Sequence, residues 1–334
     1  MRKHTPLAVA VCSALGMLVL ILDARTALSG ASAGVTLCIQ TVIPSLFPFL
    51  ILSTMLTATL VGHPMRPLGW LGRLLRLPAG AACIYLTGLL GGYPVGAQNI
   101  AVACRKQQLS TRDARRMLAF CSNPGPAFLF GIGSTVFADP MRCWSVWGIV
   151  ILSSLTVGIL TPGKPDMRPI SHKHQTVSIT DALRTSVITI ALVCGWVVIF
   201  RVILAFADRW FLWLLSQQGQ VLLYGLTELS NGCCALAALS NEDVKWVLYT
   251  LFLSFGGLCV TLQTHSVLAG SGVKCHLYLP GKLTQTAVSL LLCCLFTREI
   301  SWLWMLPAVP ICVIYRIWAE KLQNSSRNCS CVGV

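Results

Sequence analysis

The chain has 334 residues, of which 55% are hydrophobic and only 11% are charged. Soluble domains average about 25% charged residues, so the composition excludes an ordinary soluble fold and predicts an all-α, polytopic membrane protein. The net charge is +14, with 25 Lys and Arg against 11 Asp and Glu. These basic residues stand in short loops between apolar runs, and no basic patch alternates with aromatic residues. The charge therefore indicates orientation in a membrane and no nucleic-acid partner.

The N-terminal region begins with Arg2, Lys3 and His4, which precede an apolar run at 7–22. This order fits either a cleaved signal peptide or a retained first transmembrane helix. We expect a retained helix with a cytoplasmic N-terminus, because the rest of the chain is also rich in membrane-like segments. The following piece, at 25–40, is amphipathic and is expected to lie in the membrane interface.

Eight apolar runs approach the roughly 20 residues that a bilayer crossing requires. They lie at 7–22, 44–62, 117–137, 141–162, 182–205, 246–270, 283–297 and 301–319. Two further runs, at 79–104 and 219–240, are too short for two crossings and are interrupted near their middles. We interpret both as re-entrant hairpins, which enter and leave the membrane on the same side. Trp210 and Trp213, in the piece at 208–216, are expected at the depth of the aromatic belt.

The elements from residue 44 onwards repeat their order with reversed orientation. Each half has a helix, a hairpin, a helix with a break and a returning helix, and a linker rich in Pro and basic residues separates the halves. Loop charge supports this topology, since most Lys and Arg, including Lys282, fall on the predicted cytoplasmic side and few, including Arg201, fall outside. We predict an inverted-topology repeat with two re-entrant hairpins and two broken transmembrane helices. The domains are an N-terminal helix with its interfacial segment at 1–33, a first repeat at 34–162, a cytoplasmic linker at 163–181, a second repeat at 182–297, and a C-terminal helix and tail at 298–334.

Four stretches break the apolar runs with Gly, Pro and amide side chains. They are GLLGGYPVGAQN at 88–99, FCSNPGPAFLFG at 120–131, LTELSNGCC at 226–234 and LSFGGLCVTLQ at 253–263. Backbone that is not helical is tolerated at membrane depth only where it is buried in protein or lines a cavity, and paired breaks are typical of a transporter's substrate site. The predicted substrate-binding residues are Gly91, Gly92, Tyr93, Pro94, Gly96, Gln98, Asn99, Ser122, Asn123, Pro124, Gly125, Thr227, Glu228, Ser230, Asn231, Gly232, Ser254, Gly256, Gly257, Thr261 and Gln263.

Glu228 is the one carboxylate within a predicted membrane segment. A charged group at the bilayer centre costs about 2.5–3.5 kcal/mol to insert, so Glu228 is expected to face a cavity or a partner. It could bind a coupled proton or cation, or accept hydrogen bonds from a solute. It could instead cap a half-helix or satisfy Asn231. His265, near the inner end of its helix, is expected to be an interface residue rather than a proton relay.

The 16 cysteines are scattered singly or in adjacent pairs, without a CxxC motif, and are expected to be small apolar residues with free thiols. No cofactor and no metal site is predicted. Cys121, Cys233 and Cys259 lie near the breaks, which leaves iron permeation open as an alternative. The chain contains no HExxH, GxSxG or P-loop motif, so we expect no enzymatic activity.

Four segments carry a longer and more specific pattern. They are GVTLCIQTVIPSLFPFLILSTML at 34–56, the block from GGYPVGAQN to FCSNPGPAFLFGIG at 91–133, LTELSNGC at 226–233 and LSFGGLCVTLQTHSV at 253–267. Together they resemble the YlbJ family of sporulation integral membrane proteins. The resemblance implies a nucleoside-recognition (Gate) domain, distantly similar to concentrative nucleoside transporters and ferrous-iron permeases. The positions that match the family's motifs are Gly92, Pro94, Gly96, Asn123, Gly125, Glu228, Asn231, Gly256 and Gly257. The pair Gln98 and Asn99 departs from the lysine or other small polar pattern that the resemblance implies after GA.

These features predict a transporter or facilitator for a small polar metabolite that is expected to be anionic. The resemblance implies a role in sporulation, with a dipicolinate-like solute, in the bacterial cytoplasmic membrane of the mother cell or forespore. The expected partners are the lipid bilayer, the solute and a coupling proton or sodium ion, and a homo-oligomer remains open. The alternatives are a membrane assembly factor that transports nothing, and the permeation of nucleosides or iron.

Overall fold

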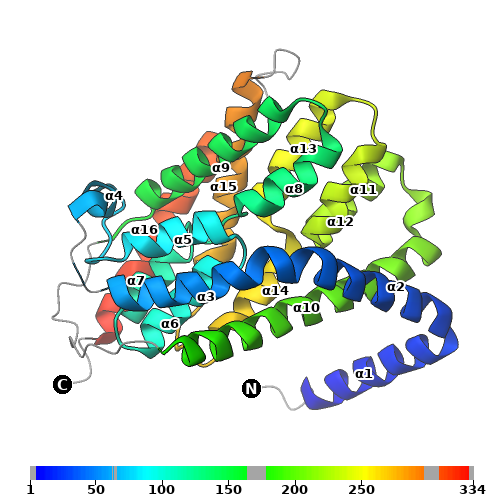
Figure 1. Ribbon diagram of the computed structural model, residues 1–334, viewed down its shortest axis with the longest axis horizontal. Helices are drawn as coiled ribbons and strands as arrows, with labels where there is room; N and C mark the ends of the chain where they lie inside the picture. The colour runs from blue at the N-terminus through cyan, green and yellow to red at the C-terminus, as the bar shows by residue number, and fades with distance from the viewer. Residues whose placement is uncertain (1–4, 62, 64–65, 164–177, 297–307, 331–334) are drawn as a thin grey trace.

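The computed structural model describes residues 5–61, 63, 66–163, 178–296 and 308–330 (Figure 1). Within this part of the chain every regular element is a helix, so the predicted all-α class is confirmed. Among the described residues, four helical stretches are long and apolar enough to cross a membrane. They are Ala24–Leu60, Pro140–Leu160, Ile179–Trp210 and Glu242–Leu268. The chain is therefore an all-helical integral membrane protein.

We expected a separate interfacial piece at 25–40, but these residues belong to a longer helical stretch, Ala24–Leu60. Helix α1 (Thr5–Leu22) is followed by α2 (Ala24–Leu37), which continues through a π-helical turn at Cys38–Val42 into α3 (Ile43–Leu60). Glycines in α2 allow this long helix to pack closely on α10, because a Cβ atom on Gly30 would lie only 2.9 Å from the Cα atom of Val202. Small residues of this kind commonly let membrane helices approach each other.

The first predicted hairpin is present as α5 (Ala82–Gly91) and α6 (Val95–Arg105). The chain turns between them at Gly92, whose φ of +85° is one that residues with a Cβ rarely adopt. The break at 123–126 is also present, but the predicted helix 117–137 is helical only in its second part. After α7 (Thr111–Met117), the chain runs without regular helix to Gly125, and α8 (Pro126–Val136) follows.

The second half contains the corresponding elements. Helix α10 (Ile179–Trp210) is followed by a hairpin of α11 (Gln217–Thr227) and α12 (Leu229–Ala235), which meet at the extended residue Glu228. Helices α13 (Glu242–Phe255) and α14 (Gly257–Leu268) meet at Gly256, which has a left-handed conformation with a φ of +84°. Both breaks that the sequence predicts in this half are therefore present in the backbone.

The remaining helices are α4 (Gly69–Leu74), α9 (Pro140–Leu160), α15 (Tyr278–Phe296) and α16 (Ala308–Ser330). Helix α15 begins five residues before the predicted run at 283–297, so Lys282 lies in a helix and not in the inner loop where we expected it. The predicted run at 301–319 is described only from residue 308 onwards, where it coincides with α16.

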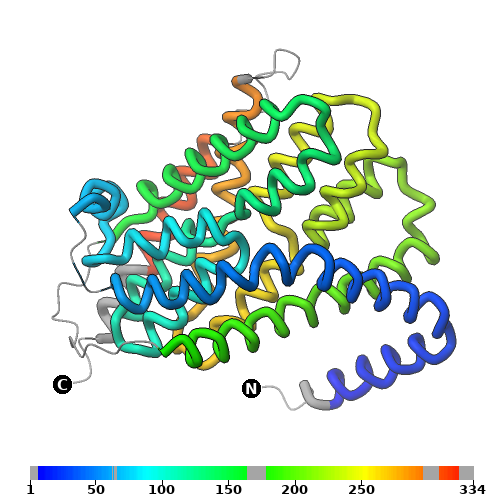
Figure 2. Tube along the Cα trace, in the orientation of Figure 1, coloured from blue at the N-terminus to red at the C-terminus, as the bar shows by residue number. Residues whose placement is uncertain are grey.

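The helices pack in pairs (Figures 1 and 2). Helix α3 lies beside α10, α9 beside α15, and the two members of each hairpin lie against each other. The end of the first hairpin, α6, packs on α14, and the end of the second, α12, packs on α8. Apolar side chains face outwards on α1 and α10, where Ile21 is 74% and Ile188 is 56% exposed. A bilayer provides the apolar surroundings that such a surface requires.

Candidate functional site

The four breaks meet at one small internal cavity of about 50 Å³. The first hairpin contributes Gly92, the loop before α8 contributes Gly125, the second hairpin contributes Glu228, and α14 contributes Gln263. The complete lining is Val42, Ser45, Leu46, Gly92, Tyr93, Pro124, Gly125, Phe128, Val193, Val197, Glu228, Leu229, Ser230, Val260 and Gln263. A water molecule takes up about 30 Å³ in the liquid, so the cavity in this conformation is large enough for water and too small for a metabolite.

Two glycines bring the first two breaks into direct backbone contact. A Cβ atom on Gly92 would lie 2.8 Å from the backbone nitrogen of Gly125, and one on Gly125 would lie 2.9 Å from that of Gly92. Gly88 in α5 and Gly96 in α6 allow a similar close approach, because a Cβ atom on either would overlap the carbonyl oxygen of Cys121. The non-helical chain before α8 can therefore lie against α5 and α6 only if these positions carry no side chain.

Tyr93 links the first hairpin to the break in the second half. Its hydroxyl group donates a hydrogen bond of 3.0 Å to the carbonyl oxygen of Leu253, which is in the last turn of α13. Its ring lies beside the break, since a Cβ atom on Gly256 would be 3.3 Å from the ring. The tyrosine side chain thus occupies the space that Gly256 leaves open.

Lys282 is a functional candidate that sequence analysis missed. Its side chain is completely buried, and its ammonium group donates to the hydroxyl of Tyr93 at 3.0 Å and to Oε1 of Gln285 at 2.7 Å. The ammonium group also lies 3.4 Å from Oδ1 of Asn123 and 4.8 Å from the centre of the Tyr93 ring. Among the described residues no carboxylate forms an ion pair with it. Neutral oxygens and an aromatic face provide its polar surroundings.

Asn123 is the centre of this polar network. Its Oδ1 accepts a hydrogen bond of 2.8 Å from Gln285, and its amide nitrogen donates one of 2.8 Å to the carbonyl oxygen of Phe120. The network therefore joins the first broken helix to α15 and, through Lys282 and Tyr93, to the first hairpin and α13. The motif HLYLPGKLTQ at 276–285 places Lys282 three residues before Gln285. This spacing would have indicated the pair if α15 had been predicted to start earlier.

Glu228 is buried, with 2% of its surface exposed, and it lines the cavity. Its two carboxylate oxygens accept hydrogen bonds from the backbone N–H groups of Ser230 at 3.0 Å and Asn231 at 2.8 Å. These N–H groups have no partner within a helix, so Glu228 caps the start of α12. Of the roles weighed from sequence, the structure displays the cap, and the cavity beside the carboxylate leaves room for a ligand or water.

Several predicted residues bind neighbouring helices instead of lining the cavity. Gln98 donates to Oγ1 of Thr54 at 2.8 Å, and Asn99 donates to Oγ1 of Thr87 at 2.9 Å. The hydroxyl of Ser254 donates to that of Ser289 at 2.7 Å. The predicted residues that line the cavity are Gly92, Tyr93, Pro124, Gly125, Glu228, Ser230 and Gln263. The others surround it or lie elsewhere: Gly91, Pro94, Gly96, Gln98, Asn99, Ser122, Asn123, Thr227, Asn231, Gly232, Ser254, Gly256, Gly257 and Thr261.

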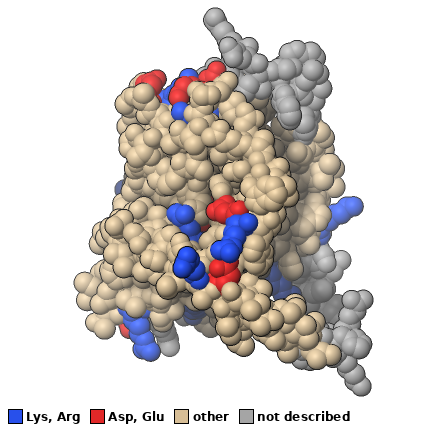
Figure 3. Space-filling model, turned by 90° about the vertical axis from the view of Figure 1, so that its right-hand side faces the viewer, with Lys and Arg blue, Asp and Glu red and all other residues tan. Residues whose placement is uncertain are grey.

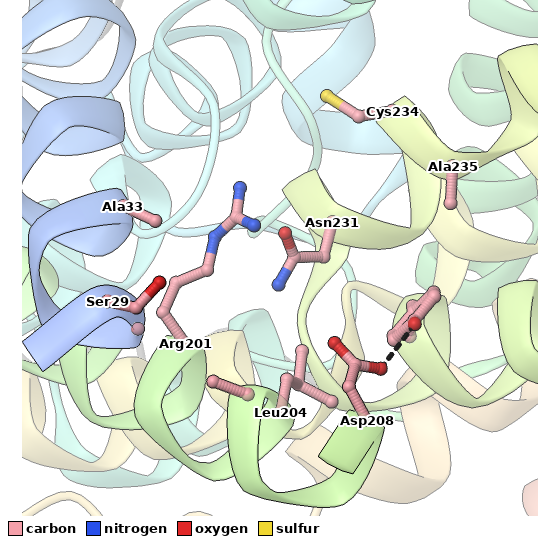
Figure 4. A pocket seen from close by; sticks show the side chains of 11 residues that line it. Ser29, Ala33, Arg201, Leu204, Asp208, Asn231, Cys234 and Ala235 are labelled. Atoms are coloured by element: carbon pink, nitrogen blue, oxygen red, sulfur yellow. Dashed lines mark hydrogen bonds between the residues drawn. The ribbon is translucent and has the colours of Figure 1, made fainter. Parts of the chain in front are cut away.

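A second, open pocket of about 450 Å³ lies between α2, α10 and the second hairpin (Figure 4). Its lining residues are Ser29, Gly30, Ala33, Arg201, Leu204, Ala205, Asp208, Tyr224, Asn231, Cys234 and Ala235. Asn231 connects the two spaces, because its backbone N–H binds Glu228 while the residue itself lines the second pocket. Sequence analysis placed Arg201 on the outer side and assigned it no role.

No three His, Cys, Asp or Glu side chains come together as a metal site in the part of the chain that the structure describes. Cys121, Cys233 and Cys259 are buried, free thiols in separate elements. The polar groups of the two cavities are therefore suited to hydrogen bonding and charge interactions more than to metal coordination.

The fold and the site define an all-helical integral membrane protein with polar groups gathered at interrupted helices. The chain is similar to the sporulation integral membrane protein YlbJ of Bacillus subtilis (strain 168), with 22% identity over 315 residues. The similarity covers 78% of this chain and 75% of that protein. It confirms the resemblance to the YlbJ family that the sequence motifs predict. No family model matches the chain, and no solved structure gives a significant match.

Proposed function

We propose that the protein is a transporter or facilitator that moves a small polar solute across a bacterial cytoplasmic membrane without changing it chemically. The observation that supports this most directly is the meeting of all four breaks at one small cavity that Glu228 lines. Broken helices that converge near the middle of a bundle are the usual construction of a substrate site in secondary transporters.

The packing of the helices supports an inverted-topology repeat. Helix α3 corresponds to α10 and α9 to α15, and each of these pairs is in contact. The contact of α6 with α14 has its counterpart in the contact of α12 with α8. Such reciprocal contacts are expected when a pseudo-two-fold axis relates the two halves and exchanges their equivalent elements. In the proposed arrangement both hairpins are re-entrant, and loop charge places the N-terminus in the cytoplasm.

The size of the central cavity suggests the transport state. A volume of about 50 Å³ excludes a metabolite, whereas the second pocket, of about 450 Å³, is open. We take this conformation to have a narrow centre and an accessible vestibule on the side of the second hairpin. A solute would reach the centre when α12 moves and takes Asn231 and Glu228 with it.

Glu228 and Lys282 are two buried ionisable side chains near Tyr93: Glu228 lines the same cavity, and Lys282 donates to the tyrosine hydroxyl. A buried carboxylate beside a cavity suits the binding of a coupled proton or sodium ion. Lys282 suits an anionic solute, which the family resemblance also suggests, in the form of a dipicolinate-like metabolite. The name of the Bacillus relative supports a role in sporulation. The family resemblance implies the membrane of the mother cell or forespore as the location.

The second candidate function is that of a membrane assembly factor that transports nothing. The observation in its favour is the small volume of the central cavity. Permeation of nucleosides remains a variant of the transport proposal. Iron permeation has less support, because the cysteines near the breaks do not gather into a metal site among the described residues.

The proposal is tested by uptake into proteoliposomes that contain the full chain. The solutes are carboxylates such as dipicolinate, nucleosides and ferrous iron, each measured with and without a proton or sodium gradient. We expect one class to enter and Glu228→Gln to abolish its gradient-driven uptake. Glu320→Gln is the matched control, because Glu320 is exposed and its ion-pair partner, Arg316, is exposed as well. If no solute enters and Glu228→Gln changes nothing, the assembly-factor function is favoured.

A further inference from the structure

The second pocket contains a positive charge at membrane depth. Arg201 lies about 13 Å from Trp210 along α10, at about 1.5 Å per residue. Trp210 is 51% exposed and marks the end of the helix, while Ile199 and Ile203, on either side of Arg201, are about half exposed as apolar side chains suited to lipid. The guanidinium group is thus level with the apolar surface of the protein and faces the pocket (Figure 4).

The guanidinium group of Arg201 has no hydrogen bond and no ion pair with any of the described residues. Its buried Nε atom lacks a partner. An arginine has five N–H donors in a rigid plane and does not lose its charge, so an unpaired guanidinium group inside a membrane protein is costly unless it faces water or an anion. Figure 4 shows it directed towards the side chain of Asn231 across the pocket.

The carboxylates near the pocket are already engaged with other groups. Asp208 accepts a hydrogen bond from the hydroxyl of Tyr224. Asp23 forms an ion pair of 3.1 Å with Arg209. Figure 3 looks onto the end of the molecule where α2 and α11 lie, and charged side chains of both signs surround a hollow on that face. Glu228, the third carboxylate close by, binds the backbone N–H groups of Ser230 and Asn231. Asp208 keeps its negative charge in the lining of the pocket, but among the described residues no ion pair joins Arg201 to any of these three carboxylates.

We propose that the pocket between α2, α10 and the second hairpin binds an oxyanion, a carboxylate or phosphate group, through the guanidinium group of Arg201. Asn231 lies opposite and adds an amide donor. Arginine binds such groups through two parallel hydrogen bonds, which fixes their orientation as well as their charge. This proposal rests on the proposed transport function in one respect: the bound group would be the anionic end of the solute before the solute reaches the cavity beside Glu228.

The test uses Cys234 as a reporter, because it is an exposed, free thiol that lines the pocket. The full chain in phosphatidylcholine nanodiscs is treated with a maleimide, and the labelling of each cysteine is followed by mass spectrometry. Inorganic phosphate and phthalate are the probes, and phthalamide is the uncharged counterpart of phthalate. We expect the anions to slow the labelling of Cys234 and phthalamide not to slow it. Cys12, exposed on α1, should be unaffected by all three.

Two substitutions connect the protection to the guanidinium group. Arg201→Gln should raise the half-protecting phthalate concentration about 10- to 100-fold, because a hydrogen-bonded charge is lost. Arg201→Lys, which keeps the charge without the planar fork, should have a smaller effect. Arg184→Gln is the matched control, because Arg184 is exposed near the other end of the same helix, and it should leave protection unchanged. Equal protection by phthalate and phthalamide, or unchanged protection in Arg201→Gln, would overturn the proposal.

A lipid headgroup could provide the same oxyanion as a solute. A parallel series in nanodiscs that contain phosphatidylglycerol distinguishes the two sources. If this lipid alone slows the labelling and soluble anions add nothing, the bound group is a headgroup phosphate and the anion site stands. If Cys234 is protected but no solute enters proteoliposomes, the anion site stands and the transport proposal fails. If a solute enters proteoliposomes but no anion protects Cys234, the transport proposal stands and the anion site fails.

Discussion

The two hairpins are built alike and surrounded differently. The tip of the first, at Gly92 and Tyr93, is completely enclosed, and its polar groups bind α3, α13 and α15. The second borders an open pocket, in which Arg201 has no hydrogen bond or ion pair with the described residues. Its Glu228 lines the central cavity and binds only the backbone of its own hairpin. The first hairpin is therefore suited to remain in place, and the second is suited to move. Changes at the first should reduce stability, and changes at the second should alter function.

The largest expected effect is that of Gly96→Ala in the first hairpin. The new methyl group would overlap the carbonyl oxygen of Cys121, and a buried backbone cannot move aside without disturbing both helices. We expect a loss of about 3 kcal/mol in the free energy of unfolding. Thermal unfolding in detergent would measure it, with Gly195→Ala as the control, since that position has open space around it. A small loss would show that the first hairpin is not rigidly held.

Asn123→Ala should cause the next largest loss of stability. It removes an acceptor of Gln285 and Lys282 and the donor to Phe120, and it leaves these buried groups without one of their partners. We expect a loss of about 2 kcal/mol in the free energy of unfolding. The same unfolding assay applies, and Ser134→Ala on the exposed side of α8 should be neutral. If the two substitutions had equal effects, the network around Lys282 would not stabilise the fold.

Glu228→Gln should reduce stability less than either change in the first half. The amide oxygen can still accept one hydrogen bond at the start of α12, so we expect a loss of about 1 kcal/mol or less. Gradient-driven uptake should nevertheless disappear, because a neutral amide cannot bind a proton or sodium ion in place of the carboxylate. Comparison of unfolding temperature and uptake in one preparation checks both effects. A variant that loses stability and keeps uptake would assign Glu228 to structure alone.

Arg201→Gln should have the smallest effect on stability. The arginine has no partner to lose, so the free energy of unfolding should stay within about 0.5 kcal/mol of the original value. The same variant should have a weakened interaction with anions in the labelling assay. A clear loss of stability would mean that Arg201 holds the second hairpin to α10, and the contrast between the hairpins would then be weaker.

The sequence predicted the positions of the breaks correctly because their causes are local. Gly92 and Gly256 adopt positive φ angles that glycine adopts without strain, and Pro126 begins a helix. The predicted hairpins at 79–104 and 219–240 are recognisable as α5–α6 and α11–α12. The re-entrant orientation of both hairpins and the roles of the predicted site residues stay predictions.

Lys282 was assigned to a loop because hydropathy treats a charged residue as the end of an apolar run. Helix α15 instead begins at Tyr278, which is almost completely buried, and it carries Lys282 inwards with it. Arg201 was expected near the outer end of the run at 182–205, whereas α10 continues beyond that run to Trp210. In both cases packing against distant helices decides where the charge lies, and an average over neighbouring residues contains no information about it.

The amino-acid sequence by itself determined that this protein is helical, lies in a membrane and has interrupted helices at four places. Composition, apolar length and the conformations open to Gly and Pro depend on neighbouring residues alone. Only the tertiary structure decided which polar groups meet. Lys282 and Tyr93 are 189 positions apart and Asn123 and Gln285 are 162 apart, so their hydrogen bonds exist only because the helices pack in one arrangement. The same packing left Arg201, in an open pocket, without a hydrogen-bond partner among the described residues.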